Sequence, residues 1–428
     1  IVEPNFPAGV TLMEPSAYVQ TGLVGHFDAI RNVGMNLPHD NSATTWKNLA
    51  SGGPDATFTH RSNSPSPGYW TDKSYYFNNG TMASTVSALN LGNNFTVQIA
   101  INASPSGQAP TTTSANGSNN YHAWFNDHPK GNRGFWTYSH KNGNNGKDLV
   151  GNFDKFGGSR INIVNWGGKY VTWMLDGANG KAYTFEDAAI PTSGSLVQSM
   201  TVKTSNISSL HCWGGEQEGT RLQAFLKGDY YSVRMYNRVL TNDEHVWNRI
   251  VDEVRYRGVV TNGTVVVASN RAGAEGTEAS GTYYVNGNHT FTVPASVTID
   301  GCLYEPTGYK LETYNASTKT WNFAEERTDL SFAYTNCAAN TGARITWNWR
   351  LARGVKKIDA DDYVQGGLVL HFDGIRNAGL GTAHDSAATT WKNLGSASGD
   401  APLAVFDAER GAGAWTANGY DFDAGSCF

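Results

Sequence analysis

One stretch of the sequence occurs twice. Residues 18–49 read YVQTGLVGHFDAIRNVGMNLPHDNSATTWKNL and residues 363–394 read YVQGGLVLHFDGIRNAGLGTAHDSAATTWKNL, with 22 of 32 positions identical at a constant offset of 345 residues. The register continues downstream, because Trp70 and Tyr75 fall on Trp415 and Tyr420. Solenoid repeats recur every ~20 to 50 residues, so this period must span a whole domain or a pair of domains.

Composition and alternation predict an all-β chain. Charged residues are only 16% of the 428, whereas Gly (48), Tyr (20) and Trp (13) are abundant, as is typical of turn-rich β proteins. Alternating residues indicate strands at 94–101, 170–175 and 228–236. Residues 241–256 alone have a helical pattern, opened by a capping box of Thr241 and Glu244.

After residue 258 the strands become shorter and more regular, and residues 310–314 and 320–324 indicate a hairpin. The predicted architecture is an antiparallel jelly-roll β-sandwich, then a smaller immunoglobulin-like β-sandwich, then the first strands of a second jelly roll. The predicted segments are an N-terminal linker (1–17), the jelly roll (18–258), the small β-sandwich (259–355), and a linker with the partial second copy (356–428).

The partial copy leaves two alternatives open. Either the sequence stops before the natural end of the second jelly roll, or the partial domain pairs with a neighbouring chain by strand addition and builds a fibre.

Three motifs carry a family resemblance. Residues 22–27 (GLVGHF) are followed by residues 46–52 (WKNLASG), and residues 228–244 read GDYYSVRMYNRVLTNDE. They resemble the first strands, the last core strand and the trailing helix of laminin-G-like, concanavalin A-like jelly-roll domains in bacterial surface proteins. The resemblance implies two antiparallel sheets in a usually secreted module that binds glycans or proteins, often with calcium. This fold hosts lectins, adhesion modules, hydrolases and spacers, so the resemblance alone does not assign a function.

Charge and hydropathy exclude two classes of partner. A net charge of −5 without a basic stripe argues against nucleic acid. No apolar stretch approaches the ~20 residues that span a bilayer. The chain is rich in Asn, Ser and Thr and carries few Lys, so we expect an extracellular or cell-surface protein.

Catalytic motifs are missing from the sequence. Glycosidases of the concanavalin A-like type carry carboxylates at alternate positions of one strand. No Glu-x-Asp-x-x-Glu run occurs, and the nearest pair is Glu216 and Glu218 in a Gly-rich loop. No Gly-x-Ser-x-Gly elbow is present. The sequence therefore predicts a protein that is not an enzyme.

An acidic loop recurs in both copies. Asp28, Asn32, His39 and Asp40 recur as Asp373, Asn377, His384 and Asp385. Carboxylate and carbonyl oxygens suit calcium, which makes Asp28, Asn32 and Asp40 candidate ligands. The alternative is that these residues form turns and caps, which duplication copies equally well.

Aromatic residues are the candidate sugar platforms. A pyranose stacks its apolar face on an exposed ring, and the candidates are Tyr121, Trp124, Trp136, Trp166 and Trp213. Against this, a sandwich with 12% aromatic residues must bury many of them.

Two of the four cysteines, Cys302 and Cys337, fall in the small β-sandwich. They form a disulfide in an oxidising compartment or remain two buried free thiols.

The predicted function is non-catalytic: adhesion or carbohydrate recognition by repeated modules, with glycans or surface proteins as partners. The alternative is a structural subunit of an extracellular filament or surface layer that associates with copies of itself.

Overall fold

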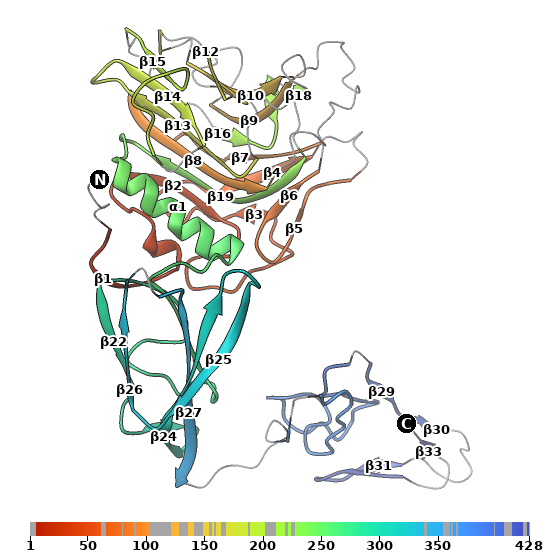
Figure 1. Ribbon diagram of the computed structural model, residues 1–428. Helices are drawn as coiled ribbons and strands as arrows, with labels where there is room; N and C mark the ends of the chain where they lie inside the picture. Colours follow the sequence, from red (N-terminus) through yellow and green to blue (C-terminus); the bar gives the residue numbers. More distant parts are fainter. Residues whose placement is uncertain are drawn as a thin grey trace. The chain divides into compact units, whose positions relative to one another are not determined.

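The protein is described from a computed structural model. It describes all residues except 1–5, 61–65, 79, 90, 103–120, 128–135, 141–148, 154–155, 158–159, 164–167, 187–188, 202–210, 219–220, 224–226, 338–339, 354–359, 361–362, 365–366, 398, 406–412, 423–425 and 428. The described part of the chain is all-β apart from a single α-helix and short 3₁₀ turns (Figure 1). Two compact units are present: residues 1–293 with 307–348, and residues 294–306 with 349–428.

Two sheets form a large β-sandwich. The first, which we call the helix-side sheet, has the order β15 (Val197–Ser199), β14 (Lys181–Phe185), β13 (Tyr170–Asp176), β8 (Asn94–Asn102), β19 (Gly228–Tyr236), β6 (Tyr75–Phe77) and β5 (Tyr69–Trp70), and β2 (Leu23–Asp28) also pairs with β19. The second has the order β12 (Arg160–Ile163), β11 (Leu149–Asn152), β10 (Trp136–His140), β9 (Tyr121–Asp127), β16 (His211–Trp213), β7 (Thr81–Thr85), β4 (Ala56–His60) and β3 (Thr45–Trp46). A hairpin of β17 (Glu216–Glu218) and β18 (Arg221–Gln223) follows β16.

The core lies between these sheets. Successive residues of a strand point to opposite faces, and alternate residues such as Val97 and Ile99 of β8 enter a buried aromatic cluster with Phe27, Trp46 and Trp213. The predicted strands over residues 94–101, 170–175 and 228–236 are confirmed. The other alternate residues of the helix-side sheet therefore form an outer face.

Helix α1 (Asn242–Arg257) lies over that outer face, where Figure 1 draws it in front of β19 and β2. The predicted capping box is confirmed, because Thr241 accepts from the Glu244 backbone and the Glu244 carboxylate accepts from the Thr241 backbone. Gly258 ends the helix in the left-handed conformation, φ 62°, which glycine adopts without a Cβ clash.

The second sandwich is smaller. One sheet has the order β1 (Gly9–Leu12), β21 (Gly281–Asn286), β20 (Thr264–Ser269), β27 (Ala343–Arg353), β24 (Cys302–Asn315) and β23 (Val297–Ile299), and β25 (Thr320–Arg327) also pairs with β24. The other pairs β22 (Asn288–Thr292) with β26 (Ser331–Thr335). The predicted hairpin is confirmed as β24 and β25. Strand β1 comes from the segment predicted as a linker, which continues through a 3₁₀ turn η1 (Pro15–Ala17).

Among the described residues of the partial second copy, every strand is two residues long. They are β28 (Thr390–Trp391), β29 (Ala401–Pro402), β30 (Ala404–Val405), β31 (Ala414–Trp415), β32 (Tyr420–Asp421) and β33 (Ser426–Cys427), which pair as β28 with β29, β30 with β33, and β31 with β32.

The predicted disulfide is wrong. Cys302 is buried at the start of β24 and Cys337 is exposed in the turn after β26, and both are free thiols. Among the described residues, no helix is both long and apolar enough to cross a membrane.

Candidate functional site

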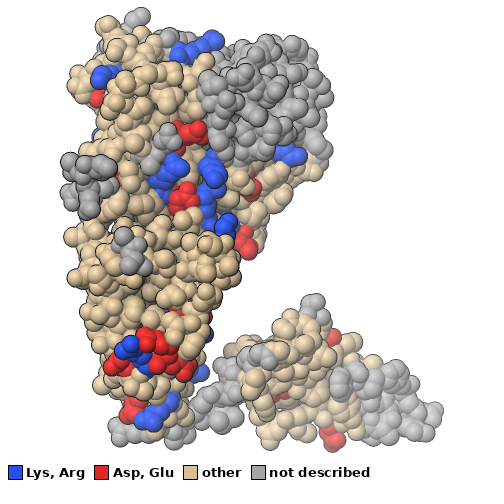
Figure 2. Space-filling view, in the orientation of Figure 1, with Lys and Arg blue, Asp and Glu red and all other residues tan. Residues whose placement is uncertain are grey.

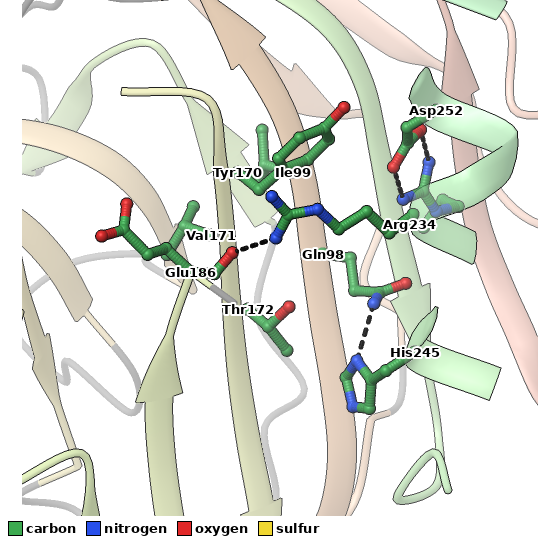
Figure 3. A pocket seen from close by; sticks show the side chains of 10 residues that line it. Gln98, Ile99, Tyr170, Val171, Thr172, Glu186, Arg234, His245 and Asp252 are labelled. Atoms are coloured by element: carbon green, nitrogen blue, oxygen red, sulfur yellow. Dashed lines mark hydrogen bonds and ion pairs between the residues drawn. The ribbon is translucent and has the colours of Figure 1, made fainter. Parts of the chain in front are cut away.

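The outer face of the helix-side sheet divides into a part covered by α1 and a part left open. Figure 3 shows the covered part, where Gln98, Thr172 and Arg234 project from β8, β13 and β19 toward the helix. These side chains are polar because they occupy the alternate positions that do not enter the core.

A buried ion pair joins the sheet to the helix. The Arg234 guanidinium donates to both carboxylate oxygens of Asp252 at 2.7 and 2.6 Å, and Tyr18 donates its hydroxyl to Asp252 at 2.8 Å. Arg234 is only 1% exposed and lies over the Tyr18 ring, 4.2 Å from its centroid. A bidentate pair with an additional donor satisfies both charges in this buried position.

A second buried pair holds the end of the helix. Arg255 donates to Asp28 at 2.8 Å, and the Tyr256 hydroxyl donates to the same oxygen at 2.6 Å. Burial acts to raise the pKa of Asp28, but Arg255, His26 and the Tyr256 hydroxyl outweigh it, so that the pKa is lowered. The carboxylate therefore stays ionised beneath the helix.

The space between these groups is small. The Gln98 amide nitrogen lies 2.8 Å from His245 Nδ1, and the Asn248 amide donates to Gln98 at 2.8 Å. Gln98 and His245 line a pocket together with Tyr170 and Arg249, and this pocket has room for about one water molecule, ≈ 20 Å³. The covered part of the face therefore binds the helix and leaves no space for a sugar ring.

The open part carries a row of side chains that we call the tyrosine row. Cross-strand pairing places Tyr69 of β5 beside Tyr76 of β6, Tyr76 beside Asp229 of β19, and Asp229 beside Asn102 of β8. Paired residues share a face, so these four side chains lie side by side on the outer face. Tyr69 is 55% exposed and its ring centroid lies 5.1 Å from that of Tyr76.

The tyrosine row has a fixed carboxylate. Ser74 donates its hydroxyl to Asp229 Oδ1 at 2.6 Å. Partial burial raises the pKa of Tyr76, and Tyr69 and Asp229 raise it further. Next to the row, Tyr231 is half-buried and stacks on Tyr256 at 5.2 Å. An aromatic surface with one anchored carboxylate can stack a flat apolar ligand and accept hydrogen bonds from its hydroxyls.

At the tyrosine row, the second copy of the repeat keeps the core-facing residues and changes the outward-facing ones. The core-facing neighbours Trp70, Tyr75 and Phe77 recur unchanged as Trp415, Tyr420 and Phe422. By contrast, Tyr69 and Tyr76 fall on Ala414 and Asp421. The two tyrosines are therefore not needed to form this pair of strands, since β31 and β32 pair without them.

The predicted aromatic platforms fare differently. Trp213 is completely buried and packs on Phe27 and Trp46, at 4.7 and 6.0 Å between ring centroids, so its prediction as a sugar platform is wrong. The other candidates fall outside the described residues: the side chains of Tyr121, Trp124 and Trp136, and all of Trp166. Sequence reasoning missed Tyr69 and Tyr76, although their alternation with Trp70, Tyr75 and Phe77 was a usable signal.

The acidic loop has a structural role. The Asn32 amide donates to the Asp40 carbonyl at 2.7 Å and accepts from the Asp40 backbone at 3.0 Å. Asp40 accepts from the backbone and hydroxyl of Ser42, and these bonds lower its pKa. Asp28 already faces Arg255, whose positive charge opposes a cation there.

Within the described residues, no three acidic, histidine or cysteine side chains form a group that could hold a metal ion. Calcium binding stays a prediction. The pair Glu216 and Glu218 lies on β17, and its side chains fall outside the described residues.

No family model and no curated protein matches the chain. Among solved structures, it is similar to a Trypanosoma rangeli sialidase in complex with sialic acid (TM-score 0.34, 14% identity, 52% of this chain and 32% of the sialidase). It is also similar to domain 4 of AbnA, a GH43 extracellular arabinanase from Geobacillus stearothermophilus, in complex with arabinotriose (TM-score 0.33, 13% identity, 53% of this chain and 98% of that domain). A third is the Ruminococcus gnavus IT-sialidase CBM40 bound to α2,3 sialyllactose (TM-score 0.27, 15% identity, 36% and 80%).

The chain spans about a third of the length of the sialidases that it matches. These likenesses contradict the prediction that the protein is not an enzyme, because the structures are named as sialidases and as part of an arabinanase. The prediction relied on the lack of a paired-carboxylate motif, and a missing motif does not exclude catalysis.

Proposed function

We propose that this protein is an extracellular carbohydrate-recognition protein that binds a sugar on the tyrosine row. The observation that carries the proposal is the placement of Tyr69, Tyr76 and Asp229 side by side on the uncovered part of the outer face. The apolar face of a pyranose stacks on the tyrosine rings, and its hydroxyls donate to the anchored carboxylate.

The physical environment supports a ligand of this kind. Tyr69 is more than half exposed, so a sugar ring that covers it removes apolar surface of both rings from water, which stabilises the complex. On the face that Figure 2 shows, acidic and basic side chains lie beside one another in small groups.

Adhesion is the biological use that we propose for this binding. A shallow row of four side chains binds a single sugar weakly, and any further binding site on the same chain increases the apparent affinity through effective concentration. Copies can also differ in ligand, because Ala414 and Asp421 replace the two tyrosines in the second copy.

A glycan array tests the proposal. We expect the full chain to bind a subset of glycans, and the Tyr69→Ala/Tyr76→Ala variant to lose that binding by at least about tenfold, the effect of losing contacts worth ~1.4 kcal/mol. Tyr69→Phe should retain most of it, because the ring stacks without its hydroxyl. Val86→Ala is the control, since Val86 is equally exposed at 58% but lies outside the row. Binding that survives loss of both tyrosines would refute the proposal, and a chelator arm tests calcium dependence.

A further inference from the structure

A second aromatic surface lies on the small β-sandwich. Strand pairing places Tyr314 opposite Trp321 and Glu312 opposite Phe323 in the hairpin of β24 and β25. Opposite residues share a face, and residues two apart on one strand share it too. All four side chains therefore lie on one face, which we call the hairpin face.

The rings of the hairpin face are open to solvent. Phe323 is 62% exposed, and Trp321 and Tyr314 are half-buried. Trp321 and Phe323 are about 7 Å apart along β25, given a rise of ~3.4 Å per residue. The Tyr314 and Trp321 rings meet edge to face at 5.2 Å. Tyr314, Trp321 and Phe323 thus form one contiguous aromatic patch, and contiguous apolar patches on a surface mark sites of interaction.

The charges around these rings cancel one another. Arg344 of β27 donates to Glu312 at 2.6 Å, and Lys310 donates to the same carboxylate at 3.2 Å. The Arg344 guanidinium also lies 4.9 Å from the centroid of the Trp321 ring. Hydrogen bonds from Arg344 and Lys310 lower the pKa of Glu312, so it remains ionised. Lys310 pairs across the strands with Glu326, whose charge offsets the remaining positive one.

We propose that the hairpin face is a second binding site and that its ligand is an uncharged polysaccharide chain. Phe323 and Trp321 stack two sugar units along the strand direction. The side chains of Lys310 and Arg344 are 38% and 32% accessible, and their charged groups donate to sugar hydroxyls. A charged polymer gains nothing from a self-neutralised face and must desolvate its own charges. The site rests on its own residues and stands whether or not the tyrosine row binds sugar.

Binding is tested in a chain whose tyrosine row is silenced. The Tyr69→Ala/Tyr76→Ala protein is titrated with soluble xylan, galactan and β-glucan as neutral probes, and with polygalacturonate as an acidic probe. We expect it to retain binding to at least one neutral probe and not to polygalacturonate. Adding Phe323→Ala or Trp321→Ala should weaken that binding about tenfold each, the effect of losing one aromatic contact.

The opposite side of the same hairpin supplies the control. Thr313 and Asn322 pair across the strands at exposed positions of the other face, and their alanine variants should leave binding unchanged. Thermal unfolding of each variant confirms that the chain is folded. Two results overturn the proposal: binding of a neutral probe that Phe323→Ala and Trp321→Ala leave unchanged, or no binding of any neutral probe by the silenced chain. So does concentration-dependent self-association that Phe323→Ala abolishes, which would make the face a protein interface.

Discussion

The two copies of the repeated segment keep the same loop but not the same strand. In the first copy Asn32 holds Asp40 through bonds of 2.7 and 3.0 Å, and in the second Asn377 holds Asp385 through bonds of 2.7 and 3.0 Å. Both asparagines are completely buried. The loop forms in both places because its hydrogen bonds are made between residues eight apart.

The strand before the loop depends on distant partners. Residues 23–28 form β2 against β19, whereas residues 368–373 are not a strand in the second copy. Tyr18 is 2% exposed because it contacts Asp252 of α1, and its counterpart Tyr363 is 60% exposed. Burial at these positions therefore comes from β19 and α1, more than 200 residues away along the chain.

Removing one aromatic side chain from each copy should give the largest difference in stability between the two copies. Phe27→Ala should lower the free energy of unfolding of the large sandwich by about 3–5 kcal/mol, because Phe27 is completely buried among Trp46 and Trp213. Phe372→Ala should cost less than about 1 kcal/mol, since Phe372 is only half-buried. Urea unfolding followed by tryptophan fluorescence measures both, and equal losses would contradict the difference.

Removing the carboxylate beneath the helix should cost nearly as much. Asp252→Ala leaves Arg234 buried and unpaired, which we expect to destabilise the large sandwich by about 3–5 kcal/mol. Glu253→Ala, one position along the helix and half-buried, is the control and should stay within about 1 kcal/mol of the unmodified chain. A small loss for Asp252→Ala would mean that α1 does not depend on the pair.

Acid should weaken the first copy through its buried histidines. Burial lowers the pKa of His26 to about 3, with Arg234 and Arg255 adding to the effect and Asp28 opposing it. Burial also lowers the pKa of His211 to about 4 and that of His245 to about 3. The unfolded chain takes up these protons near pH 6.5, so stability is complete above that pH and falls as the pH drops toward 4.

The slope is about 1.4 kcal/mol per pH unit for each histidine. Urea midpoints measured between pH 7 and pH 4 should therefore decline, and His26→Gln should make the decline shallower. A midpoint that stays constant over this range would show that the histidines are not held neutral.

The shared loop should respond equally in both copies. Asn32→Ala removes the hydrogen-bond partner of the Asp40 backbone, and Asn377→Ala removes that of the Asp385 backbone. Each change should lower the stability of its loop by about 1–3 kcal/mol. Hydrogen exchange at Asp40 and Asp385 measures the local loss of protection in each loop. Unequal effects would show that contacts with the rest of the first copy also stabilise its loop.

The smallest effect is expected at the tyrosine row. Tyr69→Ala with Tyr76→Asp, which installs the residues of the second copy, should change the free energy of unfolding by less than about 0.5 kcal/mol. The same variant should lose glycan binding. A large loss of stability would mean that the tyrosines serve the fold rather than a ligand.

Local features of the fold could be read from the sequence. The helix predicted at residues 241–256 is α1 (Asn242–Arg257), and its capping box lies within a single turn. The hairpin of β24 and β25 follows from two alternating runs joined by a short turn. Both depend on residues close in sequence, whose preferences agree with the structure.

The candidate site was mostly beyond the sequence. Tyr69 and Asp229 are 160 positions apart and become neighbours only because β6 pairs with β5 on one side and β19 on the other. A buried tryptophan and a sugar-binding tryptophan are the same residue type, and the residues next to Trp213 in the sequence do not predict that it is buried between the two sheets. An aromatic residue in the sequence is compatible with burial or with ligand binding, and only the pairing of the strands into sheets decides between them.

By itself, the sequence determined the all-β class, the repeat at an offset of 345, and the helix over residues 241–256 with its cap, because each is encoded by periodicity or by neighbouring residues. The tertiary structure alone decided that β1 joins the small sandwich through β21, and that α1 covers part of the outer face. It also decided that the tyrosine row remains open. These outcomes depend on contacts between segments hundreds of residues apart, which the burial of apolar surface selects only when the whole chain folds.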